Sequence, residues 1–319
     1  MDAALFILYE IERDVAKNGF EQLHISRETG RYANPAQREL SMCFGFHHLK
    51  VDYVNGDKWK IQPADLGALK AIFARWQERM QQAGSWNSLF WSNHDQPRVV
   101  SRFGDEGRYW KESAKMLATA QYMMRGTPYV YQGEELGMTN AHFTSIDQYV
   151  DVESRNYYEI MRAQGLSDQE ALAVLAARSR DNGRTPVWWT EEENVGFSQA
   201  TPWVWVADHP RGRSAQVQRQ QADSIYRYYQ QLFRLRKERR VIADGEIRFH
   251  PQAADPVLVY ERRWQDQRLV VACNFSAEPQ KVALPEGYIP RRCLLGNYGD
   301  TDLLTDGRIL RPYEAVILE

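Results

Sequence analysis

The sequence has little cysteine, with three residues in 319: Cys43, Cys273 and Cys293. Three thiols spaced so widely are too few for a disulfide framework, and they contain no CxxC pair that would hold a metal ion. Such a pattern is typical of buried thiols in a reducing compartment. We therefore expect a cytoplasmic protein without disulfides and without a bound metal or other cofactor.

Long apolar runs and an excess of one charge are also missing. No segment approaches about 18 uninterrupted apolar residues, the length that a membrane-spanning helix needs. The N-terminal run in MDAALFILYEIERD follows Asp2 rather than a basic region and leads into alternating charge, which is unlike a signal peptide. The net charge of −2 gives no reason to expect nucleic acid or an anionic membrane as a partner.

Aromatic residues, in contrast, are numerous. The chain has ten Trp, seventeen Tyr and twelve Phe. The C–H face of a pyranose ring stacks well on an aromatic face while the sugar hydroxyls form hydrogen bonds at its edge. Large hydrophobic cores use the same residues, so the aromatic content favours a carbohydrate ligand only slightly.

Strand and helix patterns alternate along the first part of the chain. Apolar runs predict short buried strands at 40–46, 86–91 and 129–131. Apolar residues at helical spacing predict helices over 3–17, over 64–83, around Met116 to Met123, from the capping box at Ser167 to Arg178, and around Ile225 to Leu235. A repeating strand–helix unit indicates an α/β fold with parallel strands, and polar clusters follow the strands, where α/β barrels carry their chemistry.

Beyond Gly245 the apolar period changes from 3.6 to 2. Short β runs such as 257–260 and 269–272 alternate with turn residues. The pattern predicts a small all-β domain over 246–319.

His94 and Asp95 form the first candidate site, directly after a predicted buried strand. A carboxylate there could bind sugar hydroxyls and stabilise an oxocarbenium-like transition state. An aspartate is also a favoured helix N-cap, and from the dipeptide alone the cap is the preferred interpretation. The pair Glu134–Glu135 follows the next strand, but successive side chains point apart, so a structural role is preferred there.

Basic residues make two further candidate sites. Arg180 and Arg184 lie in one loop, where they could bind hydroxyls or simply pair with acids in that loop. The run from His47 to Lys50, with Lys58 eight residues on, is a cationic cluster that suits a phosphate group. A solvated basic face, partly offset by Asp52 and Asp57, is an equally good interpretation. Metal binding by the adjacent histidines is disfavoured because their side chains diverge.

Four segments carry a resemblance to a known family, in this order along the chain: FHHLKVDY, FWSNHDQPRVVSRFGDEG, RGTPYVYQGEELGMTN and SRDNGRTPVWW. They resemble motifs of the α-amylase superfamily, glycoside hydrolase family 13. Within it, the branch of oligoglucosidases and trehalose-6-phosphate hydrolases fits best. The resemblance covers roughly residues 31–319.

The resemblance implies a (β/α)8 barrel followed by an antiparallel β domain. Residues 1–245 would be the C-terminal part of the catalytic barrel, with about strands six to eight, and 246–319 the β domain. The aspartate that matches Asp95 is the third catalytic carboxylate of the family and holds the sugar at the point of cleavage. His94 and Arg184 match residues that contact the same sugar, while Glu134 and Glu135 stay structural.

The resemblance also implies a substrate. Oligo-1,6-glucosidases usually carry an acidic stretch close to FEHMDLD where this chain has FHHLKVD. In trehalose-6-phosphate hydrolases, lysines that match Lys50 and Lys58 bind phosphate. The expected reaction is therefore retaining hydrolysis of α,α-trehalose 6-phosphate to glucose and glucose 6-phosphate, with a small sugar phosphate as the partner molecule.

Departures from the family pattern are as informative. The motif of barrel strand six begins at about Glu39, so the strand that carries the family's nucleophile is not matched. Residues 6–15 resemble the helix before strand five, but 16–30 show no clear acid/base motif, and Glu21 is only the nearest carboxylate. We expect the chain alone to be inactive, with open sheet edges that could pair with a complementary barrel fragment.

Two other functions stay open at this point. One is an oligo-1,6-glucosidase remnant, and the other is a non-catalytic protein that binds a sugar phosphate or a partner. Smaller departures fall at three positions where the family usually has Asn, Gln and Arg: Gly45, Trp188 and Val150.

Overall fold

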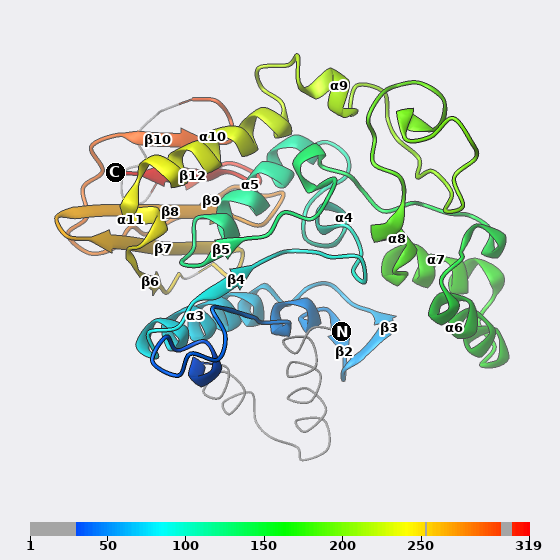
Figure 1. Ribbon diagram of the computed structural model, residues 1–319, viewed down its shortest axis with the longest axis horizontal. Helices are drawn as coiled ribbons and strands as arrows, with labels where there is room; N and C mark the ends of the chain where they lie inside the picture. Colours follow the sequence, from blue (N-terminus) through cyan, green and yellow to red (C-terminus); the bar gives the residue numbers. More distant parts are fainter. Residues whose placement is uncertain (1–29, 253, 301–307) are drawn as a thin grey trace.

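The computed structural model describes residues 30–252, 254–300 and 308–319 (Figure 1). The helix predicted over 3–17, Glu21 and all but the last residue of the unmatched stretch 16–30 lie outside the described residues. Within the described part, the chain forms a short parallel sheet with its crossover helices and a larger antiparallel sheet.

The parallel sheet has three strands in the order β1-β4-β5. They are short, and their pairing is parallel throughout: β1 (Cys43–Phe44), β4 (Asn87–Leu89) and β5 (Thr127–Pro128). The connections are helical, through α3 (Leu66–Gln82), α4 (Val99–Phe103) and α5 (Trp110–Tyr122). The predicted strand–helix repeat is therefore confirmed, and the parallel strands among the described residues form this partial sheet and no closed barrel.

The third strand lies earlier than the sequence predicted. The expectation was a strand at 129–131, but the ladder pairs Thr127 with Ser88 and Pro128 with Leu89. A proline has no N–H to donate, which is tolerated here because β5 is the outer strand. The backbone N–H of Tyr129 still donates to the carbonyl of Leu89 at 2.7 Å, so regular pairing ends just where 129–131 begins.

Helix positions agree closely with the apolar periodicity. The helix predicted over 64–83 is α3, and the Asp65 side chain caps it by accepting from the Ala68 N–H at 2.8 Å. The predicted capping box also forms, because Ser167 Oγ accepts from the N–H of Glu170 and the Glu170 carboxylate accepts from the N–H of Ser167. The other described helices are α6 (Val152–Ala163), α7 (Asp168–Arg178), α8 (Asp181–Arg184), α9 (Ala215–Gln218), α10 (Ile225–Glu238) and α11 (Arg240–Ala243), with 3-10 turns η1 (His47–Lys50), η2 (Glu134–Leu136), η3 (Ile146–Gln148) and η4 (Glu193–Gly196).

A β-hairpin that was not predicted from the sequence follows η1. It pairs β2 (Tyr53–Val54) with β3 (Asp57–Ile61). Asn55 and Gly56 form its turn with φ values of 52° and 81°, and Asn-Gly is the preferred pair where both central residues need positive φ. The hairpin places Lys58 on a strand, away from the turn that carries Lys50.

The C-terminal sheet is antiparallel, as the period-2 pattern predicted. Its five strands run in the order β10-β12-β8-β7-β6. They are β6 (Glu246–His250), β7 (Val257–Trp264), β8 (Gln267–Asn274), β10 (Cys293–Gly296) and β12 (Ala315–Leu318), while β9 (Gln280–Lys281) pairs separately with β11 (Ile309–Leu310).

The parallel sheet, its helices and the antiparallel sheet share one hydrophobic core. One hydrophobic cluster contains buried residues of α5 and α10, such as Leu117 and Leu232, together with Leu258 and Val271 of the antiparallel sheet. In Figure 1 the antiparallel sheet lies beside α5, α10 and α11, and the pair α6–α7 projects on the opposite side of the molecule. The division into domains at 245/246 stays a prediction. No helix among the described residues is long and apolar enough to cross a membrane.

Candidate active site

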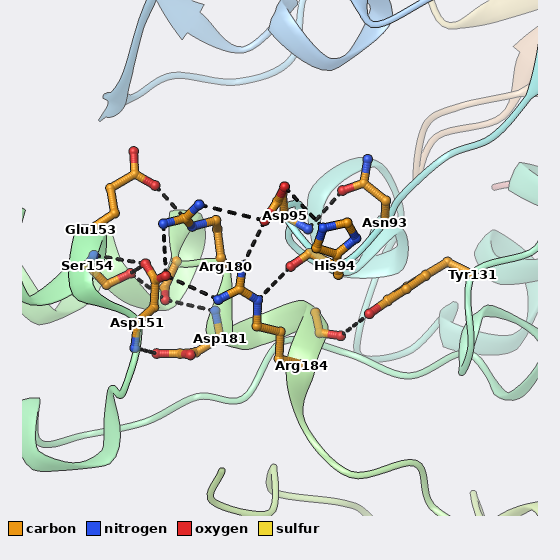
Figure 2. Close-up of polar contacts among 12 residues, drawn as sticks. Asn93, His94, Asp95, Tyr131, Asp151, Glu153, Ser154, Arg180, Asp181 and Arg184 are labelled. Atoms are coloured by element: carbon orange, nitrogen blue, oxygen red, sulfur yellow. Dashed lines mark hydrogen bonds and ion pairs between the residues drawn. The ribbon is translucent and has the colours of Figure 1, made fainter. Parts of the chain in front are cut away.

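The loop after β4 carries Asp95, and its side chain lies at the surface with 44% of its area exposed. Its backbone N–H donates to the Asn93 side chain at 2.8 Å, and its Oδ1 accepts from Arg184 Nη2 at 2.7 Å (Figure 2). Helix α4 begins at Val99 with Arg98 at the cap position. The helix-cap interpretation of Asp95 is therefore wrong, because its carboxylate turns toward α8 instead.

Arg184, at the end of α8, contacts both the loop that carries Asp95 and the residue that caps α6, Asp151. Its Nε donates to the carbonyl of His94 at 2.8 Å, its Nη2 to Asp95, and its Nη1 to Asp151 Oδ1 at 3.2 Å. Its neighbour Gly183 allows this approach, since an added Cβ would lie 2.7 Å from the carbonyl oxygen of Gln96. Arginine suits the position because its planar guanidinium directs several donors at once.

The His94 side chain is the most exposed of this group, at 70%. Its Nε2 lies 3.3 Å from Asp95 Oδ2. An exposed imidazole and an exposed carboxylate oxygen therefore share one edge of the loop, where both can reach a hydroxyl group of a ligand.

A chain of ion pairs runs from Asp95 to Lys58 (Figure 2 shows all but its last step). Arg184 and Arg180 both contact Asp151 Oδ1, at 3.2 Å and 2.9 Å. Arg180 Nε contacts Glu153 Oε2 at 3.2 Å, and Lys58 Nζ contacts the same oxygen at 2.7 Å. The structure thus brings Lys58 into the same polar network as Asp95 and Arg184.

Two buried aspartates hold the middle of this network in place. Asp151 is the N-cap of α6, where its Oδ2 accepts from the N–H and hydroxyl of Ser154, both at 3.0 Å. Burial alone would raise the pKa of Asp151, but hydrogen bonds from Ser154 and Arg180 outweigh it and lower that pKa. Asp181 accepts from the backbone N–H groups of Val150 and Asp151, and burial raises its pKa.

Lys50 lies apart from these residues. It ends η1, is exposed, and forms no ion pair or hydrogen bond with any other described residue. The two histidines beside it are not cationic. Burial lowers the pKa of His47 to about 4 and of His48 to about 3, so both are neutral at pH 7. The predicted cluster of four cationic side chains is therefore wrong, and its charge comes from the two lysines alone.

Asp52 does not offset the lysines as a surface acid. It is buried, with 4% of its area exposed, between two arginines of other elements. Its carboxylate accepts from Arg102 Nε at 2.8 Å and from Nη2 at 2.6 Å, and it also accepts from Arg178. Arg102 donates in addition to the Gln96 side chain at 2.9 Å, which ties this pairing to the loop of Asp95.

Glu134 has the structural position that the sequence analysis preferred for it. It is fully buried, and its carboxylate accepts from the hydroxyl of Ser92 at 2.6 Å and from that of Tyr122 at 2.5 Å. Burial raises the pKa of Glu134 to about 7. Glu135 bonds the backbone N–H of Gly133 at 2.9 Å, so both carboxylates hold the turn after β5.

Arg98 is a structural residue that sequence reasoning missed. It is 1% exposed, and its guanidinium donates to the carbonyls of Asn182 at 3.0 Å and Gln132 at 2.5 Å. Its own N–H donates to the Asn140 side chain at 2.9 Å. One side chain therefore connects the loops after β4 and β5 with α8. A lone arginine within a polar loop gives no sequence signal for such a role.

The departures from the family pattern fit their surroundings. A Cβ at Gly45 would lie 2.6 Å from the ring of Trp76, so glycine allows that tryptophan to pack. Trp188 is fully buried in the hydrophobic cluster around Leu136 and Leu175. The side chain of Val150 is exposed, and its backbone N–H donates to Asp181 at 2.9 Å.

The exposed side of the site offers donors and acceptors suited to sugar hydroxyls. Asp95 accepts, His94 and Arg184 donate, and the buried aspartates fix the arginines behind them. The described residues contain no group of three or more His, Cys, Asp or Glu that could hold a metal ion. The chemistry that this side of the site supports is therefore recognition of a polar, hydroxyl-rich ligand.

Comparison with known proteins gives a consistent result. The family described as "Alpha amylase, catalytic domain" matches residues 13–245. The trehalose-6-phosphate hydrolase of Bacillus subtilis is 46% identical over 291 residues, which cover 90% of this chain and 52% of that protein. That of Escherichia coli is 43% identical, with 90% and 52% covered, and the oligo-1,6-glucosidase of Halalkalibacterium halodurans is 42% identical, with 89% and 51% covered.

A solved structure agrees with these sequence relatives. The crystal structure of Bacillus licheniformis trehalose-6-phosphate hydrolase matches with a TM-score of 0.88 at 43% identity, covering 92% of this chain and 54% of that one. The chain spans about half the length of the relatives it matches. By the matched catalytic domain and these identities, the chain belongs to the α-amylase family of glycoside hydrolases, glycoside hydrolase family 13.

Proposed function

We propose that this chain carries the substrate-anchoring side of a trehalose-6-phosphate hydrolase. The reaction is retaining hydrolysis of α,α-trehalose 6-phosphate to glucose and glucose 6-phosphate. Asp95 holds the sugar at the point of cleavage, His94 and Arg184 bind the same sugar, and Lys50 and Lys58 bind the phosphate.

The observation that carries this proposal is the pairing of Asp95 with Arg184 at an exposed edge. Their contact at 2.7 Å joins the loop after β4 to α8, which lies almost ninety residues further along the chain. The similarity to relatives named trehalose-6-phosphate hydrolase, at 46% and 43% identity, supports a phosphorylated substrate for this chain. The position of Lys58 in the same ion-pair network supports its role, whereas Lys50 rests on the resemblance alone.

We also propose that the chain is inactive by itself. A retaining glycosidase needs a nucleophilic carboxylate and a second one as acid/base, about 5 Å apart. The described carboxylates near Asp95 are already engaged: Asp151 and Asp181 are buried and hydrogen bonded, and Glu153 is paired with two cations. Among the described residues β1 and β5 are the outer strands of the parallel sheet, and a complementary barrel segment that pairs with their edges would supply the other carboxylates.

The purified chain is expected to release no glucose from trehalose 6-phosphate, because the residues that the structure describes place no unengaged nucleophilic carboxylate beside Asp95. Glucose release is measured against the complete Bacillus subtilis relative under the same conditions. Turnover near that of the complete enzyme would contradict the inactivity that we propose.

An oligo-1,6-glucosidase is the second candidate, favoured by relatives of that name at 42% identity. It shares Asp95 and Arg184 with the first candidate but has no use for a phosphate site. All three cysteines are buried and none forms a disulfide, which supports a cytoplasmic location for either enzyme.

A further inference from the structure

Glu153 places one carboxylate oxygen between two cationic side chains. Its Oε2 lies 2.7 Å from Lys58 Nζ and 3.2 Å from Arg180 Nε. The three side chains are 32%, 23% and 27% exposed, so this contact lies at the boundary with solvent. An oxyanion bridged by an ammonium and a guanidinium is also the arrangement in which proteins bind a phosphate oxygen.

Both cations are held by contacts that do not involve Glu153. Arg180 donates through Nη2 to the buried carboxylate of Asp151 at 2.9 Å. Lys58 Nζ lies 4.6 Å from the centre of the Trp59 ring, and that ring stacks on Tyr157 of α6 with centroids 4.5 Å apart. Both cations would therefore keep their places if the Glu153 side chain turned away.

We propose that Lys58 and Arg180 form a binding site for the phosphate monoester of a sugar, and that Glu153 competes with the phosphate for this site. The proposal rests on the function proposed above and adds Arg180 as the second cation. Lys50, the other lysine assigned to the phosphate above, does not contact Glu153 and is not needed for this pair. Glu153 lies in the first turn of α6, and its flexible side chain can leave toward solvent when a phosphate takes its position.

Competition of this kind predicts a gain in affinity when the carboxylate is removed. With Glu153→Gln, a phosphate no longer displaces an ion pair, and the negative charge that repels it is gone. We expect the affinity for glucose 6-phosphate to rise by about two- to fivefold, the range of a partly exposed ion pair. A gain cannot arise from misfolding, which makes this variant the informative one.

The experiment is calorimetric titration of the whole chain with glucose 6-phosphate, inorganic phosphate and glucose. The variants are Glu153→Gln, Lys58→Gln, Arg180→Gln and the control Glu159→Gln, an exposed residue on the same helix. We expect tighter binding only with Glu153→Gln, loss of binding with Lys58→Gln and Arg180→Gln, and no response to glucose alone.

Three outcomes overturn the proposal. One is no phosphate binding by either the parent chain or the Glu153→Gln variant. Another is an equal gain with Glu153→Gln and Glu159→Gln, which would reflect overall charge alone. The third is weaker binding with Glu153→Gln. The proposed function can fail separately. If Glu153→Gln binds phosphate more tightly but the parent chain prefers trehalose to trehalose 6-phosphate, the proposed substrate is wrong and the phosphate site is retained.

Discussion

Replacing Asp52 by asparagine is expected to lower the free energy of unfolding by about 3 kcal/mol, because it leaves two buried arginines without a counter-ion. The carboxylate is the shared partner of Arg102 and Arg178, whose side chains are each 5% exposed. Urea denaturation followed by circular dichroism measures the loss. The matched control is Asp266→Asn, at an exposed hairpin turn, where almost no change is expected.

The same carboxylate gives this stabilisation a pH dependence. Burial alone would raise the pKa of Asp52, but the hydrogen bonds and charges of Arg102 and Arg178 outweigh it and lower that pKa. A group with a lowered folded pKa stabilises above its unfolded pKa, about 4, and loses that contribution as the pH falls further. The difference between parent and variant should be full at pH 7 and shrink below about pH 4. A difference independent of pH would contradict this origin.

Replacing Arg98 by methionine is expected to cost about 3 kcal/mol of unfolding free energy, since two backbone carbonyls lose their donor. Those carbonyls belong to Gln132 and Asn182, on two different loops. The change should also loosen α8, and with it the position of Arg184. Thermal and urea unfolding measure the stability, and hydrogen exchange of the loops measures the loosening.

Arg234→Met, at an exposed position on α10, is the control for the loss of a positive charge. It should leave stability nearly unchanged. Equal destabilisation by Arg98→Met and Arg234→Met would show that the buried hydrogen bonds of Arg98 contribute little.

The sequence predicted elements where one physical signal dominates. The apolar spacing from Leu66 to Met80 determines α3, and the capping box at Ser167 marks the start of α7. The third strand was predicted too late in the chain. Tyr129 to Tyr131 carry the apolar pattern, but the residues that pair with β4 are Thr127 and Pro128. The hairpin was not predicted, although the Asn55–Gly56 pair is a typical hairpin turn signal, because the segment was considered only for its basic residues.

The site was predicted residue by residue but not as a network. Motif resemblance indicated Asp95 and Arg184, and the structure adds their contact. The resemblance could not indicate that Glu153 bridges Lys58 and Arg180, because these residues come from distant segments of the chain that only the fold brings together. The charge of the histidines was misjudged for a related reason, since burial decides their pKa and a local sequence does not show burial.

The central claim is that this chain retains the phosphate-selective, sugar-anchoring side of a glycosidase site. Calorimetric titration of the parent chain with α,α-trehalose 6-phosphate and with α,α-trehalose tests it directly. The account predicts that the phosphorylated sugar binds at least about tenfold more tightly. A tenfold difference in affinity is about 1.4 kcal/mol, which one charge-assisted hydrogen bond to the phosphate can supply. Equal affinity for the two sugars, or binding of neither, would contradict it.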